Sequence, residues 1–209
     1  MYLISNRNLC SKEKYIKTIV EAAKNNVEYL ILREKDLEYK DLEKLYNEIV
    51  LALKENNADI NIIVNSSIEL YENYQVYGIH LPYKLFKDLL SMDYKFDKNK
   101  KIGLSLHSTD EVIELNKIIE SKKIDIDYIT LSHIFETKCK ERLKPRGVEL
   151  LKNSRGLTKV KIVALGGILP QNVDEIVEYC DDYAVMSTLF KSSDVKNIIE
   201  AYNKNWNKL

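Results

Sequence analysis

Short apolar runs alternate with longer amphipathic stretches eight times along the chain. The runs are rich in Ile, Val, Leu and Tyr and predict strands, whereas the stretches carry apolar residues three and four apart and predict helices. Runs such as YLIL and KIVAL are continuously apolar, as expected for parallel strands covered on both faces. Eight strands, each followed by a helix, predict an α/β fold of the (β/α)8 TIM barrel type. A doubly wound open sheet is the alternative.

The predicted elements follow one another without a gap long enough for a second domain. The expected strands are Tyr2–Ile4, Val27–Arg33, Ile60–Val64, Gly78–Leu81, Ile102–Leu106, Tyr128–Leu131, Lys161–Leu165 and Asp182–Met186. The expected helices are Lys12–Asn25, Tyr39–Glu55, Ser67–Asn73, Tyr83–Leu90, Thr109–Glu120, Gly147–Asn153, Pro170–Cys180 and Asp194–Trp206. Several of them open on a Ser, Thr or Asp cap or on an N-terminal Pro. We therefore predict one compact barrel domain over residues 1–209.

Composition restricts the class of partner. Lys and Arg number 32 and so do Asp and Glu, and this zero net charge argues against a nucleic-acid or anionic-membrane partner. No apolar run approaches the roughly 18 residues that a transmembrane helix needs, and the N-terminus lacks the order of a signal peptide. Three widely spaced cysteines argue against a disulfide framework and a cysteine zinc site. We expect a cytoplasmic protein.

Polar residues collect just after the predicted strands, where barrels place their active sites. The loops begin with Arg33-Glu34-Lys35, Asn65-Ser66-Ser67, Leu81-Pro82, His107-Ser108, Ser132-His133, Gly166-Gly167 and Ser187-Thr188. All three histidines, His80, His107 and His133, fall at strand ends, which makes a role in acid-base chemistry as well supported as a purely structural one.

The seventh and eighth loops match the place where many barrels bind phosphate. Glycine lets a backbone approach an anion closely, and backbone N–H groups at a helix start point at it. The plainer interpretation is a tight turn at Gly166-Gly167 and a helix cap at Ser187. Their joint occurrence in the order of the fold favours a phosphate site.

Arginine is rare in this chain, with five Arg against 27 Lys. A forked guanidinium recognises carboxylate or phosphate in a bidentate way, so Arg33, Arg142 and Arg146 are candidates for anion binding. Surface salt bridges with Glu34 or Glu141 are the alternative.

The longest loop, from Ser132 to Gly147, is rich in polar groups and is expected to close over a ligand. Cys139 lies between two lysines, and a nucleophilic thiolate there is less favoured than an ordinary loop thiol.

The motifs SHIFETKCK and PRG in this loop, with ILREK upstream and VALGGI and AVMSTLF downstream, resemble the thiamine phosphate synthase superfamily, and within it the thiazole tautomerase branch. The resemblance covers nearly the whole chain and implies a (β/α)8 barrel that binds a thiazole phosphate as its small-molecule partner. It assigns the substrate phosphate to Thr137, Gly167, Met186 and Ser187.

The chain departs from the synthase pattern at the expected magnesium site. The resemblance places an aspartate after the third strand, where this chain has Asn65-Ser66-Ser67, and a second one after the fourth, where LPYKLF has no carboxylate before Asp88. Magnesium prefers oxygen ligands, usually including carboxylates. We therefore predict no metal and no cofactor. The Gln of the synthase QxRxK motif is Ile31, while Arg33, Lys35 and Lys140 remain as candidates for the substrate carboxylate or another anion.

At position 133 the synthases commonly have Pro and the tautomerases His. The resemblance therefore predicts a metal-independent isomerase, in which His133 moves a proton to aromatise a thiazole-ylidene carboxylate phosphate. The alternatives are a thiamine phosphate synthase, which couples a pyrimidine pyrophosphate to a thiazole phosphate with magnesium, and a non-catalytic thiazole-phosphate-binding regulator. A homodimer is left open.

Overall fold

The computed structural model describes residues 1–137 and 144–207 and contains eight parallel strands in the order of a closed barrel, β1-β2-β3-β4-β5-β6-β7-β8. The strands are β1 (Tyr2–Ile4), β2 (Tyr29–Leu32), β3 (Asn61–Asn65), β4 (Gly78–Pro82), β5 (Lys101–Leu106), β6 (Tyr128–Ser132), β7 (Lys161–Leu165) and β8 (Asp182–Val185). The predicted (β/α)8 barrel is confirmed, and the open sheet is wrong because the strand order closes on itself.

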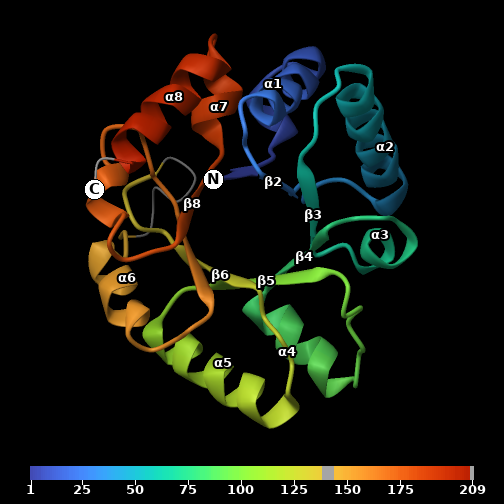
Figure 1. Cartoon of the computed structure of the whole chain (residues 1–209). Coiled ribbons are helices and arrows are strands. Elements are labelled where there is room, and N and C mark those ends of the chain that lie inside the picture. Colours follow the sequence, from blue (N-terminus) through green and yellow to red (C-terminus); the bar gives the residue numbers. More distant parts are fainter. Residues whose placement is uncertain (138–143, 208–209) are drawn as a thin grey trace. The chain divides into compact units, whose positions relative to one another are not determined.

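Helices follow the strands along the chain (Figure 1). In the described residues, the α-helices are α1 (Lys12–Lys24), α2 (Tyr39–Glu55), α3 (Ile68–Asn73), α4 (Tyr83–Ser91), α5 (Thr109–Lys122), α6 (Val148–Arg155), α7 (Ser187–Lys191) and α8 (Val195–Trp206), and the 3-10 turns are η1 (Arg7–Leu9) and η3 (Val173–Ile176). Side chains of Ser11, Ser67, Ser108 and Asp194 accept backbone N–H bonds at the starts of α1, α3, α5 and α8, as polar caps do.

Two elements differ from the sequence prediction. The segment Pro170–Cys180 contains the 3-10 turn η3 in place of an α-helix, and the side chain of Asn172 accepts the N–H of Leu169 at 2.8 Å, which closes a turn before it. The five-residue helix α7 directly after β8 was not expected as a separate element. A single helical turn is too short to show the apolar periodicity on which the prediction depends.

Contacts group the chain into two compact units, a first unit of residues 1–79 and 185–209 and a second unit of residues 80–184. The single domain over residues 1–209 stays a prediction. No helix in the part of the chain that the structure describes is both long and apolar enough to cross a membrane.

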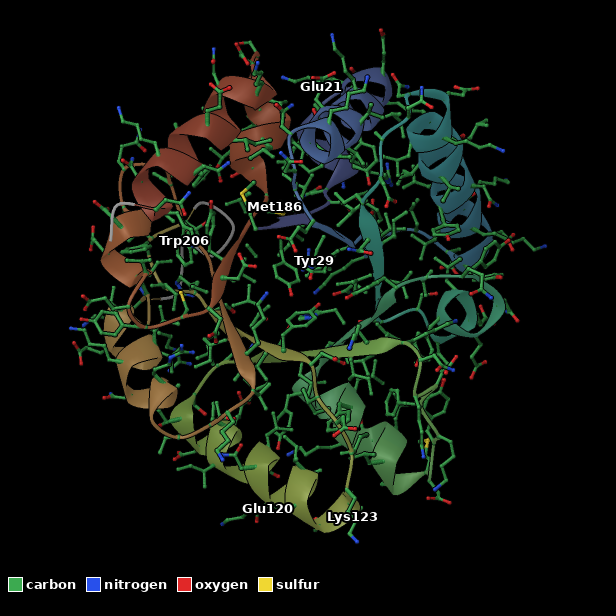
Figure 2. All side chains as sticks on the ribbon, in the orientation of Figure 1. Glu21, Tyr29, Glu120, Lys123, Met186 and Trp206 are labelled. Atoms are coloured by element: carbon green, nitrogen blue, oxygen red, sulfur yellow. The ribbon has the colours of Figure 1, made fainter. Side chains whose placement is uncertain are left out.

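In the first unit, α1 lies between α2 and α8 (Figure 1) and buries Tyr15, Ile19 and Ala22. The register Tyr2↔Tyr29↔Asn61 aligns β1, β2 and β3. Tyr29, labelled in Figure 2, stacks on Tyr2 with ring centroids 4.4 Å apart at the amino ends of these strands. The candidate site residues lie at the opposite, carboxyl ends of these strands.

In the second unit, β5 to β8 pair in parallel, with Gly103 opposite Tyr128 and Tyr128 opposite Lys161. Gly103 is required there because a Cβ would lie 2.5 Å from the Tyr128 hydroxyl, within the space that the ring fills. The helix α5 is followed by its C-cap Lys123, a left-handed residue with φ of 51° that Figure 2 labels near Glu120. Every residue of β6 is buried, so the loop after β6 begins at a well-packed strand.

Candidate active site

Two cations stand together directly after β2. Arg33 is half-buried and Lys35 is exposed. The positive charge of Arg33, with a smaller contribution from partial burial, lowers the pKa of Lys35. Within residues 1–137 and 144–207, neither side chain has an ion-pair partner. Two adjacent, uncompensated cations at a strand end form a candidate site for an anion.

The carboxylates next to these cations are bound elsewhere. Asp36 forms a 2.6 Å ion pair with Arg7, and buried Glu34 accepts the Ser5 hydroxyl at 2.6 Å. The alternative salt bridge between Arg33 and Glu34 is therefore absent in the described structure. The sequence motif identified the two cations. It did not show that the neighbouring carboxylates of Glu34 and Asp36 bind other residues and leave the cations available to an anion.

The end of β3 carries amide and hydroxyl groups instead of carboxylates. The Asn65 amide donates to the Ser66 hydroxyl at 3.0 Å, and the Ser67 hydroxyl caps α3 by accepting the Leu70 N–H at 3.3 Å. The described residues contain no cluster of three His, Cys, Asp or Glu side chains that could hold a metal. These donors do not fit the carboxylate-held magnesium that the family pattern implies.

In the second unit, the structure brings His133 against the glycine pair after β7. His133 follows β6 and is only 3% exposed. Gly166 has φ of 102°, and a Cβ on it would lie 2.8 Å from the His133 Cα and collide with its Cβ. The Gly166 carbonyl also accepts the Phe135 N–H at 2.9 Å. Gly166 therefore serves the close packing of the two loops, and His133 lies inside this packing.

Gly167 holds the segment that leads to Thr137. Its φ is 68°, and a Cβ would collide with the carbonyl oxygens of Glu136 and Phe135, lying 2.7 Å from the latter. The Gly167 carbonyl accepts the Asn172 amide at 3.1 Å. Glycine is therefore needed at both positions for the backbone conformation and for close packing, which agrees with the alternative interpretation of a tight turn. Phosphate binding by Gly167 and Thr137 stays a prediction.

The remaining predicted phosphate residues lie in the first unit. Met186, labelled in Figure 2, precedes α7 without a side-chain cap, and Ser187 is the first residue of that helix. The role of these two residues stays a prediction. Lys140, Cys139 and Arg142 lie outside the described residues. Arg146 is exposed, and its backbone N–H donates to the His133 carbonyl at 2.9 Å.

The other two histidines belong to hydrogen-bonded networks. The His80 ring lies 3.1 Å from the Tyr128 hydroxyl and 2.7 Å from the Ser105 hydroxyl, and is 4% exposed. The His107 Nδ1 lies 3.0 Å from the Ser132 carbonyl. The sequence analysis did not identify Tyr128 and Ser105 as partners of His80. Small or polar residues alternate with apolar residues along β5 and β6, and this pattern was the available signal.

Two cavities are lined by residues other than the predicted site residues. One of about 430 Å³ in the first unit is lined by residues that include Arg7, Cys10, Tyr15 and Lys44. The other, of about 550 Å³ in the second unit, is lined by Arg155, Thr158, Lys159, Lys161 and Asp181. Neither contains a predicted site residue.

The fold and the cation pair define a parallel barrel with a candidate anion site in the loop after one of its strands. A family model described as thiamine monophosphate synthase matches residues 1–189. The chain therefore belongs to the thiamine monophosphate synthase family.

Relatives extend this likeness over nearly the full chain. A thiamine-phosphate synthase of Syntrophomonas wolfei is 27% identical over 215 aligned positions, covering 100% of this chain and 96% of the relative. A putative thiamine-phosphate synthase 2 of Aquifex aeolicus is 31% identical over 168 positions, covering 80% and 84%. The solved thiamine phosphate pyrophosphorylase of Pyrococcus furiosus shares the fold, with a TM-score of 0.76 and 22% identity over 99% of this chain and 95% of that one.

These relatives correct the functional prediction. The expected thiazole tautomerase, and with it the isomerase class, is wrong, because the relatives that match the chain over most of its length are named as thiamine-phosphate synthases. The prediction relied on one loop motif and on two missing aspartates. Such local features report on a few contacts, whereas the likeness to the synthases extends over the whole barrel.

Proposed function

We propose that the chain is a thiamine phosphate synthase, which joins a pyrimidine pyrophosphate to a thiazole phosphate and releases pyrophosphate. The observation that carries the proposal is the pair of uncompensated cations, Arg33 and Lys35, after β2. The relatives named thiamine-phosphate synthase support the same reaction.

The cation pair suits a leaving group that gains negative charge. In the coupling, the pyrimidine carbon gains a bond to the thiazole nitrogen and loses its bond to the pyrophosphate oxygen, so charge develops on the departing anion. Fixed cations stabilise such charge without reorganising. The Arg33 guanidinium offers a bidentate fork, and Lys35 adds a compact charge beside it. A bound anion also offsets the repulsion that lowers the pKa of Lys35.

The second substrate carries a monophosphate, and the resemblance of the sequence assigns it to Thr137, Gly167, Met186 and Ser187. This assignment stays a prediction for the synthase, as does anion binding by Lys140. The proton-shuttle role of His133 belonged to the isomerisation and is not part of the proposal.

The donors after β3 do not fit a carboxylate-held magnesium ion. Asn65 donates to the Ser66 hydroxyl, and the Ser67 hydroxyl caps the start of α3. Among the described residues, Arg33 and Lys35 are the groups that would stabilise the charge of the leaving pyrophosphate.

The test is direct synthesis. Purified protein is incubated with both phosphorylated substrates, with magnesium titrated from zero, and thiamine phosphate and pyrophosphate are quantified. We expect equal amounts of the two products. Arg33→Ala should raise the KM for the pyrimidine pyrophosphate about 10- to 100-fold, the range expected when a charged hydrogen-bond donor is lost.

The matched control is Arg155→Ala, which removes an arginine that pairs with Asp181 at 2.6 Å in the second unit. Its KM should stay close to that of the wild type. Absence of thiamine phosphate at every magnesium concentration, with folded protein, would overturn the proposed function.

A further inference from the structure

Glu34 is a buried carboxylate held by three donors. It is 6% exposed and accepts hydrogen bonds from the Ser5 hydroxyl at 2.6 Å, the Tyr15 hydroxyl at 2.9 Å and the Arg7 backbone N–H at 3.0 Å. A buried carboxylate is costly unless such bonds replace its water. All three donors come from the segment around β1 and α1, so Glu34 fastens the end of β2 to that segment.

Ser5 connects this carboxylate to Arg33. The single hydroxyl proton of Ser5 is donated to Glu34, and the same oxygen accepts the backbone N–H of Arg33 at 2.8 Å. The Ser5 backbone N–H also donates to the Ile31 carbonyl at 2.9 Å. Ser5 is fully buried. The chain of bonds from Glu34 through Ser5 therefore fixes the backbone from which the Arg33 side chain departs.

The cations need this fixation because they repel each other. Arg33 lowers the pKa of Lys35, and neither group has an ion-pair partner in the described part of the chain. Both oxygens of Glu34 are occupied by donors from the β1 side, so its charge is not used to neutralise Arg33 or Lys35. Within the described residues, the arrangement therefore leaves both cations without a neutralising carboxylate.

We propose that Glu34, acting through Ser5, is a positioning residue that sets the geometry of Arg33 and Lys35 for a pyrophosphate group. The inference rests on the proposed function for the identity of the anion. Glutamine at position 34 keeps the size of the side chain but has one acceptor oxygen and one NH2 group. Three converging donors cannot all be accepted by one amide oxygen, so one donor would face the NH2 group and the link would shift.

The experiment separates positioning from turnover by using inorganic pyrophosphate as a probe. Its binding to the wild type, Ser5→Ala, Glu34→Gln and the double variant is measured by calorimetry, and steady-state kinetics are measured on the same proteins. We expect each single variant to weaken pyrophosphate binding about 5- to 30-fold, between the effect of losing a neutral hydrogen bond and that of losing one to a charged group. The KM should rise to a similar degree, with kcat changed less than about threefold.

The double variant distinguishes one linked path from two independent losses. The effects of substitutions within one hydrogen-bond network are not additive. The double variant should therefore bind pyrophosphate no more weakly than the single variant with the lower affinity. Full additivity would contradict the link through Ser5. If Glu34→Gln does not fold, Ser5→Ala alone carries the test.

The matched control is Thr158→Ala in the second unit. The Thr158 hydroxyl makes the same pair of bonds as Ser5, donating to the Asn116 side chain at 3.0 Å and accepting the Val160 N–H at 3.1 Å. Its loss should lower stability without changing pyrophosphate binding.

Unchanged binding in folded Ser5→Ala and Glu34→Gln, or a wild type that does not bind pyrophosphate, overturns the inference. Pyrophosphate binding that depends on Glu34, without any thiamine phosphate formed, overturns only the proposed function.

Discussion

Gly167→Ala is expected to destabilise the protein strongly. Gly167 has φ of 68°, and a Cβ there would collide with the carbonyl oxygens of Glu136 and Phe135. An L-residue in the left-handed region costs about 1–2 kcal/mol. Overpacking against fixed neighbours costs about 1–3 kcal/mol. Together these give a loss of about 2–5 kcal/mol in the free energy of unfolding.

Thermal and urea unfolding check this value. For a chain of this size, 1 kcal/mol corresponds to about 2–4 °C in Tm, so the expected decrease is roughly 5–15 °C. Gly156→Ala is the matched control. Gly156 has φ of −78°, and its Cβ would have no heavy atom within 4 Å.

The control should be stabilised by about 0.4–1 kcal/mol, because alanine restricts the unfolded chain without strain in the folded one. Equal Tm values for Gly167→Ala and Gly156→Ala would show that neither the positive φ nor the close approach of the Phe135–Glu136 backbone matters. The reasoning about the glycine pair would then be refuted.

Two further predictions concern Cys180 and Asp181, the two residues that precede β8. Burial alone would raise the pKa of Asp181, but the hydrogen bond from Arg155 and the Ile162 N–H outweigh it, so the folded pKa lies below the ordinary value of about 3.9. Asp181→Asn should therefore destabilise the protein at pH 7 in urea titrations, with the difference vanishing as pH falls through the folded pKa; a constant difference down to pH 2 would contradict this. Burial raises the pKa of Cys180 to about 12, so iodoacetamide at pH 8 should modify it only after denaturant is added, as followed by mass spectrometry. Rapid labelling of Cys180 in native protein would contradict its burial.

The histidines show how far pattern reasoning goes at single residues. Their common position at strand ends was visible in the sequence, yet the structure gives them different surroundings. His80 is held by Tyr128 and Ser105, and His107 by Ser132. His133 is buried behind Gly166. A residue's position along a strand predicts its level in the barrel, but the neighbours that occupy its hydrogen-bonding groups come from other strands.

The barrel was predictable from the amino-acid sequence, because eight apolar runs and their intervening amphipathic stretches allow few other arrangements. The sequence also marked Arg33 and Lys35 as candidates for anion binding. It could not show that both are uncompensated within the described residues, which follows from the bonds that Glu34 and Asp36 form with Ser5, Tyr15 and Arg7 in the segment around β1 and α1. Charge pairing depends on contacts between residues distant in sequence, whereas the hydrophobic pattern that specifies the strands is local.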